Sequence, residues 1–389
     1  MRRTLPIALV LSLALLSSSR AAEPARVTPL PTPDGGIQPQ AVVDTQGTLH
    51  LIYFKGEAAA GDLFYVRRAA GQEKFSAPVR VNSQAGSAVA TGTIRGAQLV
   101  LGKAGRVHVA WNGSGKAAPQ SANKTPPMLY TRLNDAGKAF EPQRNVMTQT
   151  FNLDGGGALA ADTSGNVYVA WHANEVGTVN SEGSRKVWLA RSTNEGQTFG
   201  KEALAFADPT GVCTCCGMRG FVDSQGAIHI LFRSATQQTN RDMYLLSSRD
   251  AGKSFQGALL QKWSVNSCTM SSASFAGGPG GLFAAWETQK QVYFARLTPG
   301  TGQAAKPVAA PGAPMGDRKH PSLATNAAGE TLLVWTEGTG WQKGGALAWC
   351  LFDKDGKPTA QTGRINGGIP VWGLPAAVAG KDGGFIIIH

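Results

Sequence analysis

Cysteine provides the most distinctive chemistry in this sequence, because three of the five cysteines lie in one short stretch. GVCTCCGMRG holds Cys213, Cys215 and Cys216, and Cys268 follows in WSVNSCTMSS. Such residues can form disulfides, bind copper(I) or zinc as thiolates, or act in redox chemistry. The C-x-C-C spacing differs from the paired C-x2-C of common zinc sites. We therefore expect Cys213, Cys215, Cys216 and Cys268 to form disulfides, with at least one bond to Cys268, and we expect no metal and no other cofactor.

Three arginines occupy similar positions, each just before a short apolar stretch. They are Arg95, Arg219 and Arg318. The arginine fork holds a carboxylate through two parallel hydrogen bonds, so three arginines around one point would suit an anionic ligand. His172 follows an apolar run that ends in Trp, and we expect it to begin a loop near these arginines. We predict all four as ligand-binding residues.

Two carboxylates are the candidates for acid–base chemistry. Glu175 and Asp242 flank strand-like runs, in segments rich in polar residues. Two carboxylates on either side of a glycosidic bond are sufficient for its hydrolysis. We predict Glu175 and Asp242 as the catalytic residues if the protein is an enzyme.

The N-terminus and the composition indicate where the protein acts. Arg2 and Arg3 precede an apolar run and then small residues, which is the pattern of a secretory signal peptide. We expect a signal peptide over residues 1–21 and a single secreted or periplasmic domain over residues 22–389. No later apolar run is long enough to span a membrane. The net charge is +12, but no Lys/Arg run reaches five, so we expect an anionic partner other than nucleic acid, such as an acidic glycan.

Seven similar segments indicate the elements that must position these residues. Each has a turn ending in Gly and then an alternating apolar strand, at intervals of 49 to 61 residues. They read DTQGTLHLIYF, GKAGRVHVAWN, DTSGNVYVAWH, DSQGAIHILFR, GGPGGLFAAWE, NAAGETLLVWT and GKDGGFIIIH. Because about four short strands fall in each repeat, the pattern predicts an all-β fold, a β-propeller. We expect seven blades, the last a composite closed by residues 25–32 in the place of a fourth strand, with six blades as the alternative.

The repeat also separates structural residues from functional candidates. His50, His108 and His229 share one position that other repeats fill with Tyr, Phe, Leu or Ile, so we expect them to be packing residues. Cys350 corresponds to Ala and Leu in other repeats, so we expect a buried free thiol. The three clustered cysteines and Cys268 lie between blades in neighbouring repeats, where a disulfide would hold two loops together.

The turn after the third strand carries a more specific motif. It reads STNEGQTF at residues 192–199, SRDAGKSF at 248–255 and, in a weaker copy, LNDAGKAF at 133–140. An Asp or Asn side chain can cap such a turn, Gly adopts a positive φ, and the aromatic ring packs into the blade. The motif resembles the Asp-box, or bacterial neuraminidase repeat, and the chain resembles secreted sialidase-like Asp-box propellers over most of its length. This resemblance implies a ligand site on the face that carries the long loops.

The resemblance also implies what a sialidase would need: three arginines, a Tyr nucleophile with a Glu base, and an Asp acid. The six tyrosines all fall inside strand-like runs, where they are expected in the core, so we do not expect orthodox sialidase activity. We predict a monomeric propeller that binds an anionic extracellular ligand, a glycan, on the long-loop face. The alternative is a glycoside hydrolase, exo-sialidase-like, that uses acids of the same face.

Overall fold

The computed structural model describes residues 26–278 and 280–389, which consist almost entirely of short strands. The signal peptide expected over residues 1–21 lies outside the described residues. Helical structure in the described part is limited to 3-10 turns of three residues each: η1 (Pro33–Gly35), η2 (Lys103–Gly105), η3 (Ala122–Lys124) and η4 (Thr236–Gln238). None of these helices has the length or apolar character that a bilayer crossing requires. The prediction of an all-β fold with almost no helix is confirmed.

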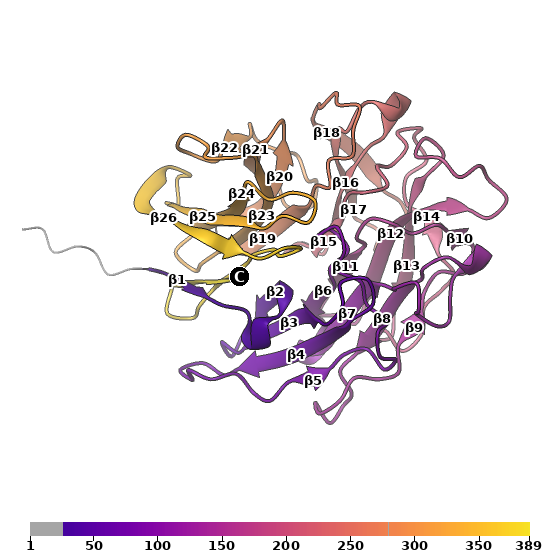
Figure 1. Cartoon of the computed structure of the whole chain (residues 1–389), viewed down its shortest axis with the longest axis horizontal. Coiled ribbons are helices and arrows are strands. Elements are labelled where there is room, and N and C mark those ends of the chain that lie inside the picture. Colours follow the sequence, from indigo (N-terminus) through magenta and orange to yellow (C-terminus); the bar gives the residue numbers. More distant parts are fainter. Residues whose placement is uncertain (1–25, 279) are drawn as a thin grey trace, which may run out of the picture.

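The described strands form seven sheets around a common centre, which is the arrangement of a β-propeller (Figure 1). Blades 1 and 2 contain β2 (Ile37–Val43), β3 (Leu49–Lys55), β4 (Asp62–Arg68) and β5 (Val79–Arg80), then β6 (Gln98–Leu101), β7 (Val107–Asn112), β8 (Met128–Arg132) and β9 (Arg144–Asn145). Blade 3 contains β11 (Ala158–Ala161), β12 (Val167–Glu175), β13 (Lys186–Ser192) and β14 (Ala203–Leu204), and β10 (Thr150–Phe151) pairs with the far end of β12.

The next three blades follow the same order along the chain. Blade 4 contains β15 (Arg219–Val222), β16 (Ile228–Arg233), β17 (Met243–Ser248) and β18 (Gln256–Gln261). Blade 5 contains β19 (Ala273–Gly278), β20 (Gly281–Thr288), β21 (Gln291–Leu297) and β22 (Val308–Ala309). Blade 6 contains β23 (Arg318–Thr325), β24 (Thr331–Glu337), β25 (Gly345–Phe352) and β26 (Pro358–Ile369).

The seventh blade joins the two ends of the described chain. β27 (Ala376–Ala379) pairs with β28 (Phe385–Ile388), and β1 (Val27–Leu30) pairs with β28 in parallel. Figure 1 shows this indigo strand beside the yellow C-terminal blade. The predicted seven blades with a composite last blade are therefore confirmed. The prediction that this segment takes the place of a fourth strand is wrong, because β1 pairs directly with β28 and so takes the third place. Since it runs parallel to β28, it ends on the face where β2 begins.

The second strand of each blade contributes large side chains to the core between blades. Their shared positions are occupied by Trp111, Trp171, Trp286 and Trp335, and by Phe54 and Phe232, all at most 4% exposed. The three histidines of the repeat are also buried, and each places Nδ1 within hydrogen-bond distance of a third-strand hydroxyl, in Tyr65, Tyr130 or Ser247. Their predicted role in packing is confirmed.

The turns after the third strands of blades 3 and 4 are held by their own side chains. Asn194 Oδ1 accepts a backbone N–H four residues later at 3.0 Å, and Gly196, with φ +73°, donates its N–H to Ser192 Oγ at 2.9 Å. Asp250 makes the equivalent bonds in the turn at residues 248–255. The side chains of each turn therefore close it locally, and in blade 3 Arg132 and Arg144 of blade 2 add hydrogen bonds to carbonyls of the turn.

Candidate functional site

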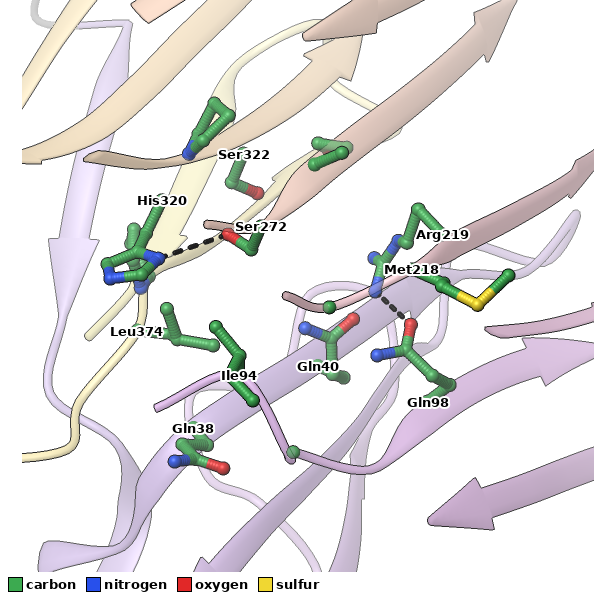
Figure 2. Close-up of a pocket in the computed structure, with 16 residues that line it drawn as sticks. Gln38, Gln40, Ile94, Gln98, Met218, Arg219, Ser272, His320, Ser322 and Leu374 are labelled. Carbon is green, nitrogen blue, oxygen red and sulfur yellow. Dashed lines mark hydrogen bonds between the residues drawn. The ribbon is translucent and has the colours of Figure 1, made fainter. Parts of the chain in front are cut away.

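The first strands of the seven blades line a central channel. We call the end at which these strands begin the loop face and the opposite end the turn face. At the loop face the channel narrows to a cavity of about 40 Å³, which has room for a few water molecules. Its lining is mostly polar (Figure 2): Gln38, Gln40, Gln98, Arg219, Ser272, Ser274, His320 and Ser322.

The turn face opens into a much larger cavity of about 800 Å³. Its wall is mostly aliphatic and aromatic, with Val42, Leu99, Leu159, Phe221 and Phe275. By volume alone this cavity would suit a small-molecule ligand better. However, its lining includes the carboxylate of Asp44, which disfavours an anionic ligand, whereas no acidic side chain of the described residues lines the loop-face cavity, so charge favours the loop face although size favours the turn face.

Arg219 lies between the two cavities and lines both of them. Its guanidinium donates a hydrogen bond to the side-chain oxygen of Gln98 (Figure 2). Burial lowers the pKa of Arg219 to about 10, and no acidic side chain of the described residues offsets this effect. The channel therefore contains a guanidinium that can accept an anionic group from outside.

The other two predicted arginines do not join Arg219. Arg95 lies at the rim, where it forms an ion pair with Asp154 and donates Nε–H to the Asp154 carbonyl at 2.9 Å. Arg318 is 2% exposed, lies 5.2 Å above the ring of Trp335, and places Nε 3.0 Å from Glu337 Oε1. The structure therefore does not form a three-arginine cluster, because two of the arginines are already paired with acids.

His172 lies inside β12 and is fully buried, so its expected place at the start of a loop is wrong. The cause is β10, which pairs with residues at the far end of β12 and extends that strand beyond Trp171. His172 Nε2 lies 3.2 Å from the carbonyl of Cys216, and Arg185 lies 3.4 Å from Nδ1. Burial and the charge of Arg185 lower the pKa of His172 to about 3, so the ring is neutral.

The two predicted catalytic carboxylates belong to neighbouring blades. Glu175 is exposed at the end of β12. Asp242 is half-buried before β17, and its Oδ1 accepts the Trp263 backbone N–H at 2.7 Å. Neither carboxylate lines the cavity at the loop face. Their catalytic role stays a prediction.

The cysteines of the two blade-linking loops are brought together as expected. Cys215 is bonded to Cys268 with a Cα–Cα distance of 6.2 Å, and Cys350 is free and buried. Cys213 and Cys216 are free and buried too, with their Sγ atoms 3.2 Å apart. The predicted link to Cys268 is therefore present, and the four cysteines form one disulfide rather than two.

Glu287 and His320 form a buried polar pair beside the loop-face cavity, and neither residue was predicted from the sequence as a site residue. The His320 N–H donates to Glu287 Oε2 at 2.8 Å, and Lys319 Nζ lies 3.7 Å from Oε1. Burial raises the pKa of Glu287 to about 7, although Lys319 and the His320 N–H act in the opposite direction. The register of β23 shifts between Lys319 and Ser322, and His320 Nδ1 faces Ser272 Oγ at 3.2 Å (Figure 2). Pro321 lies within this shift and is its sequence signal, since proline cannot donate to the ladder.

Two tryptophans lie beside this site. Trp341 belongs to the loop between β24 and β25 and is 58% exposed. Its ring packs edge-on against Trp372, with 4.8 Å between ring centroids, and the Trp372 carbonyl accepts the Gln38 side-chain N–H at 2.9 Å. Since Gln38 lines the loop-face cavity, an exposed aromatic surface lies next to the channel.

No protein-family model matches the chain. No curated protein matches it either. Solved structures with a similar fold include a protein of unknown function from Dyadobacter fermentans, which is 14% identical, with 78% of this chain and 90% of that chain covered and a TM-score of 0.50. The Hadza microbial sialidase Hz136 is 15% identical, with 83% and 69% covered and a TM-score of 0.50. A mutant of the α-L-arabinofuranosidase Arb93A from Fusarium graminearum is 11% identical, with 78% and 88% covered and a TM-score of 0.52. At these identities the likeness shows a shared fold, and the Asp-box resemblance stays a prediction.

Proposed function

We propose that this protein is an exported propeller that binds an acidic carbohydrate on its loop face. Arg219 carries the proposal, because a guanidinium in a partly enclosed channel with no acidic partner among the described residues attracts an anion strongly. The loop-face cavity of about 40 Å³ is too small for a sugar ring but has room for a carboxylate or sulfate group. The acid group would therefore enter the channel while the sugar rings stay outside.

The surroundings of Arg219 support a sugar rather than another anion. Gln38, Gln40 and Ser272 offer neutral donors and acceptors around the cavity, as sugar hydroxyls require. The exposed face of Trp341 offers an apolar surface for a sugar ring. Together they suggest an acid group bound in the channel and a sugar ring stacked at its rim.

The direct test is the affinity of the mature protein for a uronate-containing oligosaccharide and for the same oligosaccharide with its carboxyl group reduced to an alcohol. We expect the acidic form to bind at least 10-fold more tightly, since one charge-assisted pair contributes on the order of 1.5–3 kcal/mol. Arg219→Gln should abolish this preference, and Trp341→Ala should weaken both ligands. Arg249→Gln, at the turn face, is the matched control and should change neither affinity.

The same assay decides which face binds. The variant Gln40→Trp places a bulky side chain at the loop face and should block binding. The variant Val100→Trp places one in the turn-face cavity and should not. The reverse result would move the site to the turn face. Equal affinity for the acidic and the neutral oligosaccharide would contradict the proposal as a whole.

The alternative function, glycoside hydrolysis, is tested separately. A tyrosine nucleophile is not favoured, because burial raises the pKa of the strand residues Tyr65 and Tyr168 to about 12. We expect no release of product from a fluorogenic sialoside. If an acidic glycan is cleaved, Glu175→Gln and Asp242→Asn should abolish turnover without abolishing binding; hydrolysis that survives both changes would exclude these two residues.

A further inference from the structure

Three sulfur atoms of the loop between β14 and β15 form one cluster. Cys213 Sγ lies 3.2 Å from Cys216 Sγ and 3.6 Å from Cys215 Sγ, and all three atoms lie within 4.8 Å of one another. Sulfur ligands bound to one soft metal ion at about 2.3 Å lie roughly 4 Å apart. The three sulfurs therefore need only small movements to bind a single ion.

Two cysteines of the cluster are buried, and one of them has hydroxyl groups beside its sulfur. Cys213 is 0% exposed and Cys216 is 2% exposed. The Ser271 hydroxyl donates to Cys216 Sγ at 3.4 Å, and Thr269 Oγ1 lies 3.1 Å from the same sulfur. Such outer contacts orient and stabilise metal-bound thiolates.

A further indication is a group of buried arginines, two of which have unmatched N–H groups. Arg185, Arg233 and Arg241 are 1%, 1% and 4% exposed, and all three lie within electrostatic range of the cysteine cluster. Nε and one terminal nitrogen of Arg185, and likewise of Arg241, have no hydrogen-bond partner among the described residues. Glu182 pairs with only one nitrogen of Arg241, at 2.7 Å. Buried N–H groups left without acceptors are costly, so Arg185 and Arg241 have donors free for a further anion, although nearby carboxylates already interact with the arginines.

We propose that Cys213, Cys215 and Cys216 form a copper(I) site, whose negative charge is balanced by Arg185, Arg233 and Arg241. Three thiolates around one copper(I) ion carry two net negative charges, which the arginines can compensate. Ligands that are all sulfur favour a soft ion. Zinc is less suitable because it prefers four ligands in a tetrahedron, and its fourth ligand would have to be Cys268, which is exposed. The sequence alone predicts disulfides at these cysteines; the buried arginines beside them are the reason to propose a metal site as well.

Loading of this site requires reduction of the Cys215–Cys268 bond. A small dithiol supplies two electrons and two protons, which convert the disulfide into two thiols, and the dithiol itself becomes a disulfide. Copper(I) then displaces one proton from each of the three ligand thiols. Cys268 is exposed whereas Cys213 and Cys216 are buried, so a reductant can reach the bond from the solvent side. The disulfide form is thus the metal-free state.

The test uses the mature protein, reduced with dithiothreitol under anaerobic conditions and titrated with copper(I) against a chromophoric copper(I) chelator. We expect one copper per chain by native mass spectrometry and only sulfur neighbours by X-ray absorption spectroscopy of the wild-type protein. The oxidised protein should bind none. Binding of zinc in preference to copper, nitrogen or oxygen neighbours, or complete loss of copper to the chelator would overturn the proposal.

Variants locate the site. Cys213→Ser and Cys216→Ser should each lose stoichiometric copper, while Cys350→Ser, which removes the other buried free thiol, should retain it. Circular dichroism checks that each variant is folded. If a variant is not folded, the X-ray absorption spectrum of the wild-type protein decides the outcome. Unchanged copper binding in folded Cys216→Ser would also overturn the proposal.

Discussion

Polar groups are satisfied in different ways in two regions: the turns after the third strands of blades 3 and 4, and the loop face between blades 4 and 5. In the turns, Asn194 and Asp250 bond to backbone groups within four residues. At the loop face, Arg233, the last residue of β16, donates to Ser271 Oγ and to the carbonyl of Glu287, which are 38 and 54 residues away. The capping side chains of the turns are therefore satisfied within the turn, whereas Arg233 meets these two acceptors only when blades 4 and 5 have docked.

The largest effect should follow from removing the centre of the long-range network. Arg233→Met would leave three buried acceptors unpaired, including Ser271 Oγ at 2.6 Å and the Arg241 carbonyl at 2.5 Å. We expect the free energy of unfolding to fall by about 3–5 kcal/mol, measured by urea denaturation. Arg249→Met removes a single bond, to the Gly300 carbonyl at the turn face, and should cost less than about 1 kcal/mol. Equal losses in the two variants would remove the distinction between the faces.

A glycine substitution tests whether the turns are fully local. Gly196 and Gly137 both have positive φ, +73° and +64°, so Ala should cost about 1 kcal/mol at either position. A Cβ at Gly196 would also overlap the Tyr130 hydroxyl, which lies 2.6 Å from His108 Nδ1 in blade 2, whereas a Cβ at Gly137 meets open space. We therefore expect Gly196→Ala to cost about 3 kcal/mol in total. If thermal unfolding shows the same loss for both variants, the turn of blade 3 does not depend on its neighbour.

As the pH rises, titration of Glu287 at the loop face should lower the free energy of unfolding, whereas titration of Asp250 in the turn of residues 248–255 should raise it. Burial raises the pKa of Glu287 from 4.5 to about 7. Between these pH values the folded protein holds a proton that the unfolded chain has lost, so the free energy of unfolding decreases as the pH rises. Glu287→Gln should remove this decrease, so its free energy of unfolding should exceed that of the wild type by about 3 kcal/mol at pH 8 and match it near pH 4. A constant difference across this range would show that the carboxyl group does not titrate.

The smallest effect is expected at the turn of residues 248–255. Hydrogen bonds from Ser254 and from nearby backbone N–H groups lower the pKa of Asp250 below 3.8. The unfolded chain therefore binds the proton more readily, and the stabilisation by Asp250 is present above pH 3.8 and lost as the pH falls below it. Asp250→Asn should reduce the unfolding midpoint slightly at pH 7, and the difference should vanish at low pH. A difference that grows on acidification would contradict this.

Features that depend on residues close in the chain could be predicted from the sequence. Turn glycines, alternating strands and capping residues act within a few positions, so blade number, blade closure and the buried Trp and His positions could all be read from the repeats. The place of Arg219 at the start of a first strand could be predicted, but its opening to the channel could not, because Arg318 also begins a first strand and does not line the channel cavity. The burial of His172 could not, since it depends on β10, and neither could the pairing of Arg318 with Glu337. Residues of the loop face take their surroundings from other blades, and no local pattern records those contacts.

The parallel pairing of β1 with β28 gives the closure of the ring a mechanical property. A force that separates the two ends of the described chain pulls β1 toward its N-terminal end and β28 toward its C-terminal end. The four residue pairs from Val27↔Phe385 to Leu30↔Ile388 would then bear the load together, in shear. An antiparallel closing strand would instead open one pair at a time from its end. The seventh blade should therefore resist tension along the chain, although it has one strand fewer than the other blades.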